Sequence, residues 1–309
     1  MKTIITQWQT NIHLGTTNET ISTDTISFKC GIFQGDSLSP LLFCLTLNPI
    51  TNLLKRNDVG YKIEKTKIHS LLYIDDLKVY ARNDEEMEKC RALIHMFSED
   101  IRMEFGLDKC ATIHIKHGKI ENSECVKNIP LLSPNESYKY LGIAQNNTIL
   151  HNQMKNKTKK EYFQRINAIL KSEINAKNTT NAIKTYAMPI LRYGFGVIRW
   201  TKNELRAIDT KTRKTLTKHG FHHPKSNTHR LYLSRKNGGR GLIGATDCQQ
   251  QECSALANYL NTAREKDPLV KIVEQTERRK INGIMSYYKG EKKVSTNKIN
   301  ETHLEKLDT

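Results

Sequence analysis

The sequence lacks any hydrophobic run long enough to cross a membrane. No stretch approaches the ~18 consecutive apolar residues of a membrane-spanning helix. The first ten residues, MKTIITQWQT, also lack the apolar core of a secretory signal. We therefore expect an intracellular protein of the nucleus or cytoplasm that does not bind a membrane.

Closely paired cysteines are lacking as well. The seven cysteines are odd in number and scattered, which predicts reduced, mostly buried thiols rather than a disulfide scaffold. Cys248 and Cys253 follow a group of histidines, but a Cys-x₄-Cys spacing without a second close pair is a poor zinc pattern. We assign no zinc site to them. The cysteines are Cys30, Cys44, Cys90, Cys110, Cys125, Cys248 and Cys253.

A surplus of positive charge is absent from the first half of the chain. Residues 1–150 hold 17 basic and 18 acidic side chains, net −1, whereas residues 151–309 hold 32 and 14, net +18. A surface of that kind is typical of proteins that neutralise nucleic-acid phosphates, although solvated helix faces give the same composition. The concentrated amphipathic stripe that cationic membrane binding needs is lacking.

The first half is predicted to mix strands and helices. Ser39 is a good N-cap with Pro40 at the first helical position, and Pro49 is expected to kink or interrupt the helix that follows. Asn83 and Glu86 form a capping box before a second helix. With these two helices, the strands give an α+β fold with an antiparallel sheet. The predicted strands are residues 21–33, 71–81, 111–118 and 137–145.

The second half is predicted to be helical. Its first helix begins at His151 and places Tyr162, Phe163 and Ile166 at core spacing. Tyr193 and Trp200 are predicted to lie in the core rather than to stack on bases. Further helices are predicted over residues 181–200, 202–219 and 245–285, with disorder in the polar tail.

The stretch LLYIDDLKVYA, residues 71–81, places two adjacent carboxylates between two apolar arms. Asp is common in turns, so Asp75 and Asp76 alone would indicate only a turn. The apolar arms predict a central sheet element that holds both carboxylates rigidly. A divalent cation would convert their repulsion into chelation, and two-metal phosphoryl transfer needs carboxylates that bridge such ions. We therefore predict that Asp75 and Asp76 are metal ligands.

Four segments follow one another along the chain: GIFQGDSLSP, LLYIDDLKVYA, FGLDKCA and YKYLGI. Their order resembles that in the reverse transcriptases of non-LTR (LINE-type) retrotransposons. Two later segments are similar to the thumb of that family and the region after it, PILRYGFGVIRWTKNELRAIDTKTRKTL and HRLYLSRKNGGRGL. A group II intron maturase fits GIFQGDSLSPLLF and the later segments less well. The likeness covers about residues 5–265.

The resemblance implies a fold and a set of roles. It implies a partial palm at residues 1–148, an all-helical thumb at 149–220, a helical region at 221–288 and a disordered tail at 289–309. Asp75 and Asp76 would bind Mg²⁺ or Mn²⁺, and Lys109 would stand near the triphosphate as a catalytic cation. The incoming nucleotide and template would meet Gln34, Gly35, Ser37 and Tyr73, and the primer grip would be Tyr140, Leu141 and Gly142.

The partners implied are an RNA template and a DNA primer or target. Lysines and arginines of two helices would contact the phosphate backbone, each set from one helix face. Any one of these lysines or arginines could equally be a solvated cation. Gln34 and Gly35 could form an ordinary turn, and Lys109 could be a helix-end cation. Residues 140–142 could simply belong to the core. The backbone contacts would be Lys155, Lys157, Lys159, Lys160, Arg165, Lys211, Arg213 and Lys214.

The third carboxylate of the family's palm is lacking. The residues before Gln34 hold one aspartate, Asp24, and one glutamate, Glu19. Asp24 lies in ISTDTISFK, which matches the strand before GIFQGD rather than the missing motif. We therefore expect a fragment of an RNA-directed DNA polymerase that is weak or inactive alone, since Mg²⁺ demands near-ideal octahedral geometry. The alternative is a non-catalytic nucleic-acid-binding remnant or a protein reused by its host.

Overall fold

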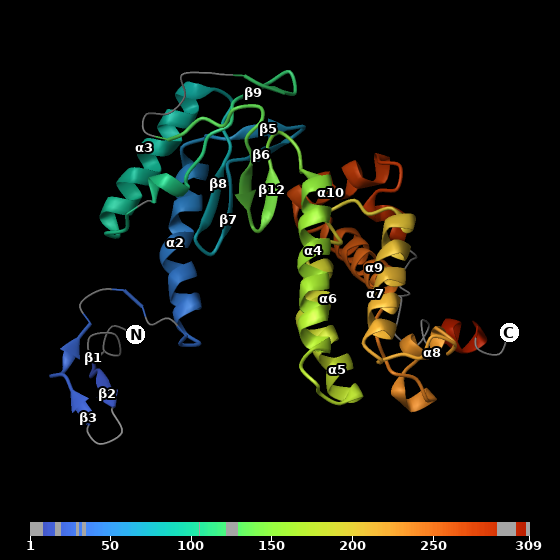
Figure 1. Ribbon diagram of the computed structural model, residues 1–309. Helices are drawn as coiled ribbons and strands as arrows, with labels where there is room; N and C mark the ends of the chain where they lie inside the picture. Colours follow the sequence, from blue (N-terminus) through green and yellow to red (C-terminus); the bar gives the residue numbers. More distant parts are fainter. Residues whose placement is uncertain are drawn as a thin grey trace. The chain divides into compact units, whose positions relative to one another are not determined.

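A computed structural model describes residues 9–15, 20–28, 31–32, 35–104, 106–121, 129–288 and 301–306 of the protein (Figure 1). Helices and small antiparallel strand pairs form an α+β structure, as predicted. The chain divides into one compact unit of Met1–Ile63 and Lys67–Phe105 and a second of Glu64–Thr66 and Gly106–Thr309. The region expected to form the palm, residues 1–148, therefore extends over both units.

Up to residue 104 the described residues form short strand pairs and two long helices. The strands pair as β1–β4, β2–β3, β5–β6 and β7–β8, each a separate two-stranded sheet. The central sheet expected around residues 71–81 is therefore not formed by the described residues. The strands are β1 (Gln9–Thr10), β2 (His13–Gly15), β3 (Thr20–Ser22), β4 (Ile26–Ser27), β5 (Tyr61–Ile63), β6 (Thr66–Ile68), β7 (Ser70–Tyr73) and β8 (Asp76–Val79); the helices are α2 (Ser39–Arg56) and α3 (Asp84–Asp100).

The core of the first unit lies between α2, α3 and the β7–β8 hairpin. Leu72 and Leu77 are cross-strand partners, and both pack against this core. Because side chains alternate along a strand, Val79 faces the helices too, whereas Tyr73 and Asp76 lie on the opposite face. One face of the hairpin is thus anchored by packing. On the other, which we call the open face, Tyr73 and Asp76 are exposed and Lys78 is partly buried. The buried core residues are Ile50, Leu54, Val59, Cys90 and Ile94.

The start and middle of α2 differ from prediction. Leu38 takes the N-cap position without a side-chain cap. Ser39 is the first helical residue, and its buried hydroxyl has no hydrogen-bond partner among the described residues. The helix runs through Pro49 without interruption. Pro49 and Leu45 are exposed, so the carbonyl of Leu45 that loses its i+4 donor can be hydrated.

The cap of α3 is confirmed in part. Asn83 accepts a hydrogen bond from the Glu86 amide at 2.9 Å, as predicted. The reciprocal bond of a capping box is replaced, because the buried Glu86 carboxylate accepts from the backbone amide and guanidinium of Arg82. Burial raises the pKa of Glu86, but the hydrogen bonds from Arg82 outweigh it and the net pKa is lowered.

The second unit is mainly helical from residue 151 onward. No described helix is both long enough and apolar enough to cross a membrane. The short elements before residue 151 are η1 (Leu107–Lys109), β9 (Ile115–Lys116), β10 (Lys119–Ile120), β11 (Tyr138–Tyr140) and β12 (Ile143–Gln145). The later elements are α4 (His151–Leu170), α5 (Ala176–Ala182), the π-helical η2 (Ile183–Ala187), α6 (Met188–Arg192), α7 (Lys202–Lys218), α8 (His229–Tyr232), η3 (Arg235–Asn237), α9 (Ala245–Ala263), α10 (Pro268–Arg279) and η4 (Ile284–Tyr287).

The main core of the second unit joins α4, η2, α6, α7 and α9. Trp200 is buried there as predicted, but Tyr193 is 66% exposed, so its assignment to the core was wrong. The β11–β12 hairpin packs on the same core through Ile143 and Ala144, which explains why it belongs to this unit. The larger members of this core are Tyr162, Phe163, Ile166, Ile183, Met188, Leu191, Phe195, Leu205, Ile208, Leu216 and Leu231.

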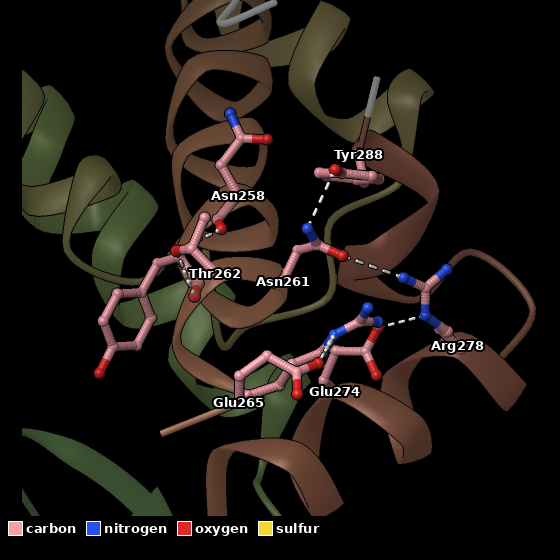
Figure 2. A network of polar contacts seen from close by, with 9 residues as sticks. Asn258, Asn261, Thr262, Glu265, Glu274, Arg278 and Tyr288 are labelled. Carbon is pink, nitrogen blue, oxygen red and sulfur yellow. Dashed lines mark hydrogen bonds and ion pairs between the residues drawn. The ribbon is translucent and has the colours of Figure 1, made fainter. Parts of the chain in front are cut away.

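A polar network fixes α10 against α9 (Figure 2). Glu274 is 2% exposed and accepts hydrogen bonds from Arg264 at 3.4 Å and from Arg278. Asn261 links Arg278 to Tyr288, with distances of 3.3 and 3.0 Å. A buried carboxylate shared by two guanidiniums is satisfied, so the network can hold the last helices together.

The expected disordered tail is helical in one part. Residues 301–306 form a helical turn, and the rest of 289–309 lies outside the described residues. His303 is buried against Tyr232 and contacts His229 at 3.0 Å and Asp247 at 3.3 Å.

Candidate functional site

Asp75 and Asp76 lie at the tip of the β7–β8 hairpin. Asp76 begins β8 and pairs across the strands with Tyr73, while Ile74 and Asp75 form the two-residue turn. Both carboxylates are exposed, and neither has a hydrogen bond or ion pair with any residue that the structure describes. Two adjacent negative charges thus stand unpaired on a hairpin whose other face is packed.

The turn that presents them is strained. Ile74 has φ 56°, a left-handed conformation that β-branched residues avoid. A positive φ at a turn position normally calls for glycine. Such outliers persist where the surrounding structure enforces them and are common at functional sites. The side chain of Ile74 is 43% exposed, so its own packing does not explain the strain.

We expect an Ile74→Gly variant to be more stable than an Ile74→Ala variant by about 1 kcal/mol. The Cβ atom that clashes in a left-handed conformation is absent only in glycine, whereas at an ordinary strand position alanine is the more stable of the two. Urea unfolding of both variants measures the difference. The opposite order would show that Ile74 is not strained.

The open face of this hairpin carries other polar and aromatic side chains beside the carboxylates at its tip. Tyr73, Asp76 and Lys78 alternate with the residues that face the core and so share this face. Burial lowers the pKa of Lys78, whose ammonium lies 5.7 Å from the Tyr80 ring. The face therefore combines aromatic surface, a cation and a carboxylate, as expected of a surface that meets a charged aromatic ligand.

The other residues expected near the nucleotide lie before α2. Gly35 has φ 94°, a backbone conformation that favours glycine. No described atom lies within 4 Å of the position that a Cβ would take, so the turn rather than close packing requires the glycine. Ser37 is exposed in the following bend. Gln34 lies outside the described residues.

The predicted primer grip forms a second hairpin. Tyr140 pairs with Ile143, and Leu141 and Gly142 form the turn with φ 46° and 78°, the pattern of a type I′ turn. The Tyr193 hydroxyl donates to the Leu141 carbonyl at 2.7 Å and so holds this turn from α6. This contact explains the exposed position of Tyr193.

Lys109 ends η1 in the second unit and is exposed. Its carbonyl accepts from the Tyr138 hydroxyl at 3.0 Å, which ties η1 to the strand that carries Tyr140. Lys109 and the predicted primer grip are thus joined within the second unit, and Tyr73, Asp75 and Asp76 belong to the first.

Two of the expected backbone contacts are already engaged. Lys155 is 8% exposed and binds the Glu204 carboxylate at 2.8 and 3.0 Å. Arg165 pairs with Glu161 and donates to the Tyr186 carbonyl, both at 2.8 Å. The five basic residues of α4 therefore do not share one exposed face, because Lys155 belongs to the packed side. Lys157, Lys160, Lys211 and Lys214 are exposed, and Arg213 donates to Tyr232.

A groove of about 340 Å³ runs between α4 and α7. Its polar lining consists of three lysines, one carboxylate and two amides: Lys159, Lys160, Lys211, Glu204, Gln164 and Asn167. The Lys211 ammonium lies 4.3 Å from the centre of the Phe163 ring, and that of Lys159 lies 5.3 Å from the Trp200 ring. Aromatic faces thus hold two lysines at the groove. Gln164 and Asn167 were not predicted from the sequence, since isolated amides on a helix carry no signal.

The described residues hold no group of three or more His, Cys, Asp or Glu side chains that could bind a metal ion. Cys248 and Cys253 are buried in α9, where Cys248 accepts from Arg192 and Cys253 donates to the Phe195 carbonyl. Burial raises the pKa of Cys253 to about 12, so its thiol is a poor metal ligand. Cys44 is exposed, unlike the other described cysteines.

Comparison with known proteins gives consistent matches. The family model described as reverse transcriptase (RNA-dependent DNA polymerase) matches residues 1–144. A retrovirus-related Pol polyprotein from the type-1 retrotransposable element R2 of Popillia japonica is 25% identical over 250 residues, which cover 77% of this chain and 40% of the relative. The polyprotein from the type-2 element R2DM of Drosophila melanogaster is 22% identical over 192 residues, 57% of this chain and 18% of the relative.

A polyprotein from the type-1 element R2 of Nasonia vitripennis is 29% identical over 126 residues, which cover 38% of this chain and 12% of the relative. The chain therefore spans well under two thirds of the relatives it matches. The match to the Popillia japonica protein extends past residue 144 into the helical part of the chain, because 250 residues exceed the length of the matched family region.

Proposed function

We propose that this chain, which belongs to the reverse transcriptases of non-LTR retrotransposons, takes part in RNA-templated DNA synthesis and contributes Asp75 and Asp76 to the metal site. The observation that carries the proposal is a pair of exposed carboxylates, without a partner among the described residues, on a hairpin anchored by Leu72, Leu77 and Val79. Carboxylates without protein partners retain the oxygen lone pairs that a hard cation requires.

These residues fit a divalent metal in part. Asp75 and Asp76 supply hard oxygen ligands, which suit Mg²⁺ or Mn²⁺. The metal would supply activation of the primer 3′-hydroxyl and neutralisation of the leaving phosphates. Tyr73 would contact the nucleotide from the open face of the hairpin.

We expect weak catalysis by this chain. The residues that the structure describes place no third carboxylate beside Asp75 and Asp76. A metal site with a missing ligand binds Mg²⁺ weakly, because this ion accepts little deviation from octahedral geometry. The same observation favours a second candidate function, nucleic-acid binding without catalysis.

Primer extension on an RNA template separates the two functions. Wild type and Asp75→Asn/Asp76→Asn are compared with Mg²⁺ and with Mn²⁺, and template–primer binding is recorded in the same samples. Slow extension that disappears in the double variant supports the polymerase. Equal extension by both proteins contradicts it, and binding without extension by either protein favours the non-catalytic function.

We propose further that the groove between α4 and α7 binds the backbone of the template–primer duplex. Lys159, Lys160 and Lys211 offer three cations within one concavity, and two of them are held on aromatic rings. These lysines would displace the condensed counterions of the duplex, so binding would weaken as salt rises. Lys155 is left out of this set because Glu204 already neutralises it.

A Lys160→Gln/Lys211→Gln variant is expected to bind an RNA–DNA duplex about tenfold more weakly near 0.1 M salt. The slope of log K against log salt should fall by about 2, one unit for each phosphate that the variant no longer neutralises. Fluorescence anisotropy at several salt concentrations measures both. Lys266→Gln/Lys271→Gln is the matched control, since it removes two exposed charges of the same unit outside the groove. Equal weakening in both variants would contradict binding specific to the groove.

A further inference from the structure

A second pocket, of about 410 Å³, lies in the segment between α7 and α9. Its polar lining comes from His222, His223, Ser226, Arg230, Arg235 and Arg240. None of these residues has a role in the function proposed above.

Glycines of the segment 238–241 bring the arginines together. Gly239 approaches the Leu233 carbonyl so closely that a Cβ would stand 2.0 Å from its oxygen, so only glycine fits. Gly241 donates to the same carbonyl at 2.7 Å, and the Arg240 amide donates to the Arg230 carbonyl at 2.9 Å. The loop therefore folds back on α8 and η3, which places three guanidiniums around one concavity.

These guanidiniums have no carboxylate partner among the described residues. Arg230 donates to the Gly238 carbonyl at 3.4 Å, and Arg235 to the Ala176 carbonyl at 3.3 Å. Arg240 lies 4.8 Å from the Phe221 ring. Residues 210–246 contain nine Lys or Arg and no Asp or Glu, so the local sequence provides no counter-charge. Three like charges in one pocket repel each other unless an anion joins them.

His222 provides an independent observation. It is 8% exposed, and its Nε2 atom is buried without a hydrogen-bond partner among the described residues. Buried polar atoms are nearly always satisfied, so an unmet one in a pocket wall indicates a missing ligand or water. Burial lowers the pKa of His222. A hydrogen bond with the Ser226 backbone raises this pKa, but the positive charge of Arg240 lowers it again, and the net pKa is lowered.

We propose that this pocket binds a phosphate group of a nucleic-acid strand. Guanidiniums match phosphate oxygens in geometry and charge, and three of them suit a group with up to two negative charges. A phosphate held by these arginines would lie beside the ring of His222, which lines the same pocket. The phosphate itself is inferred from the pocket alone, whereas a nucleic acid as its source rests on the proposed function. The source can be an internal diester or a terminal phosphate, which share this chemistry.

The test follows the His222 ring resonance in protein labelled with ¹³C-histidine, assigned with His222→Asn, while inorganic phosphate is added. Arg230→Gln/Arg235→Gln removes two exposed pocket cations, and Lys225→Gln/Lys236→Gln removes two exposed cations of the same segment outside the pocket. We expect the arginine variant to need at least about tenfold more phosphate for half-saturation and the lysine variant to stay within about twofold of wild type.

An unresponsive His222, or equal weakening by both variants, would overturn the phosphate site. The titration is then repeated with an octanucleotide carrying either a 5′-phosphate or a 5′-hydroxyl. Tighter binding of the phosphorylated form supports a terminal phosphate, and equal binding supports an internal diester. If phosphate shifts His222 but neither oligonucleotide does, nucleic acid is overturned as the source. Because the readout is a resonance and not DNA synthesis, failure of the polymerase proposal leaves this result unaffected.

Discussion

An Asp75→Asn variant should lose metal-dependent nucleotide addition by about 10²–10³-fold. The substitution keeps the shape of the side chain but removes the charge that a hard divalent cation requires. Asp75 is exposed and unpartnered among the described residues, so we expect the free energy of unfolding to change by less than about 0.5 kcal/mol. Single-turnover primer extension with protein in excess, in Mn²⁺, measures the rate even where activity is weak.

Glu85→Gln provides the control for this loss. Glu85 is an exposed acid in the first turn of α3, so its substitution removes one negative charge away from the hairpin tip. Extension by this variant should match wild type. A rate for Asp75→Asn equal to that of Glu85→Gln would contradict a metal role for Asp75.

The largest expected effect on stability is that of Glu204→Ala, about 3–5 kcal/mol. Glu204 pairs with the buried Lys155 and completes the capping box of α7 through the Thr201 amide at 2.8 Å. Removing the carboxylate leaves the Lys155 ammonium buried without a counter-charge and opens the helix cap. Denaturant unfolding measures the loss.

The acid side of the stability curve provides a second check on Glu204. Burial raises the pKa of Glu204, but hydrogen bonds from Lys155 and Thr201 outweigh it and lower the pKa below 4.5. The contribution of the Glu204 carboxylate to the free energy of unfolding is therefore complete above pH 4.5. It is lost as the pH falls through the lower pKa that Glu204 has in the folded state. Glu204→Ala should lack this part of the acid transition.

Glu161→Ala is the matched control, because Glu161 also pairs with a cation from α4 but at an exposed position. Its cost should stay below about 1 kcal/mol. A similar cost for the two variants would mean that burial of Lys155 contributes little.

Short sequence patterns correctly predicted the helix cap, helix face and hairpin that depend on contacts between neighbouring residues. Asn83 caps α3 because its side chain needs only the amide three residues ahead. Tyr162, Phe163 and Ile166 are buried because their spacing matches one face of α4. The hairpin in residues 71–81, with the two aspartates at its tip, was also predicted, because two apolar arms that flank a turn lie next to each other in the sequence. Periodicity and turn chemistry act over a few residues, which the sequence displays directly.

Contacts between distant residues were not predictable in this way. Lys155 was expected to meet phosphate, but its partner Glu204 lies 49 residues away. Tyr193 was expected in the core, yet its hydroxyl binds the Leu141 carbonyl from a distance of 52 residues along the chain. The second pocket was missed for a different reason, since Arg230, Arg235 and Arg240 are close in sequence and it is the backbone path of the glycine loop that places them around one concavity. The absence of acidic residues from 210–246 was the signal that could have indicated it.

The most direct test of the central claim is the binding of Mn²⁺, followed by the electron paramagnetic resonance of the free ion. Wild type, Asp75→Asn/Asp76→Asn and Glu85→Gln are titrated with Mn²⁺ in the presence of template–primer. If the hairpin tip is the metal site, the double variant should need at least about tenfold more Mn²⁺ than the other two proteins. Equal Mn²⁺ binding by all three proteins would contradict the assignment of Asp75 and Asp76 as metal ligands.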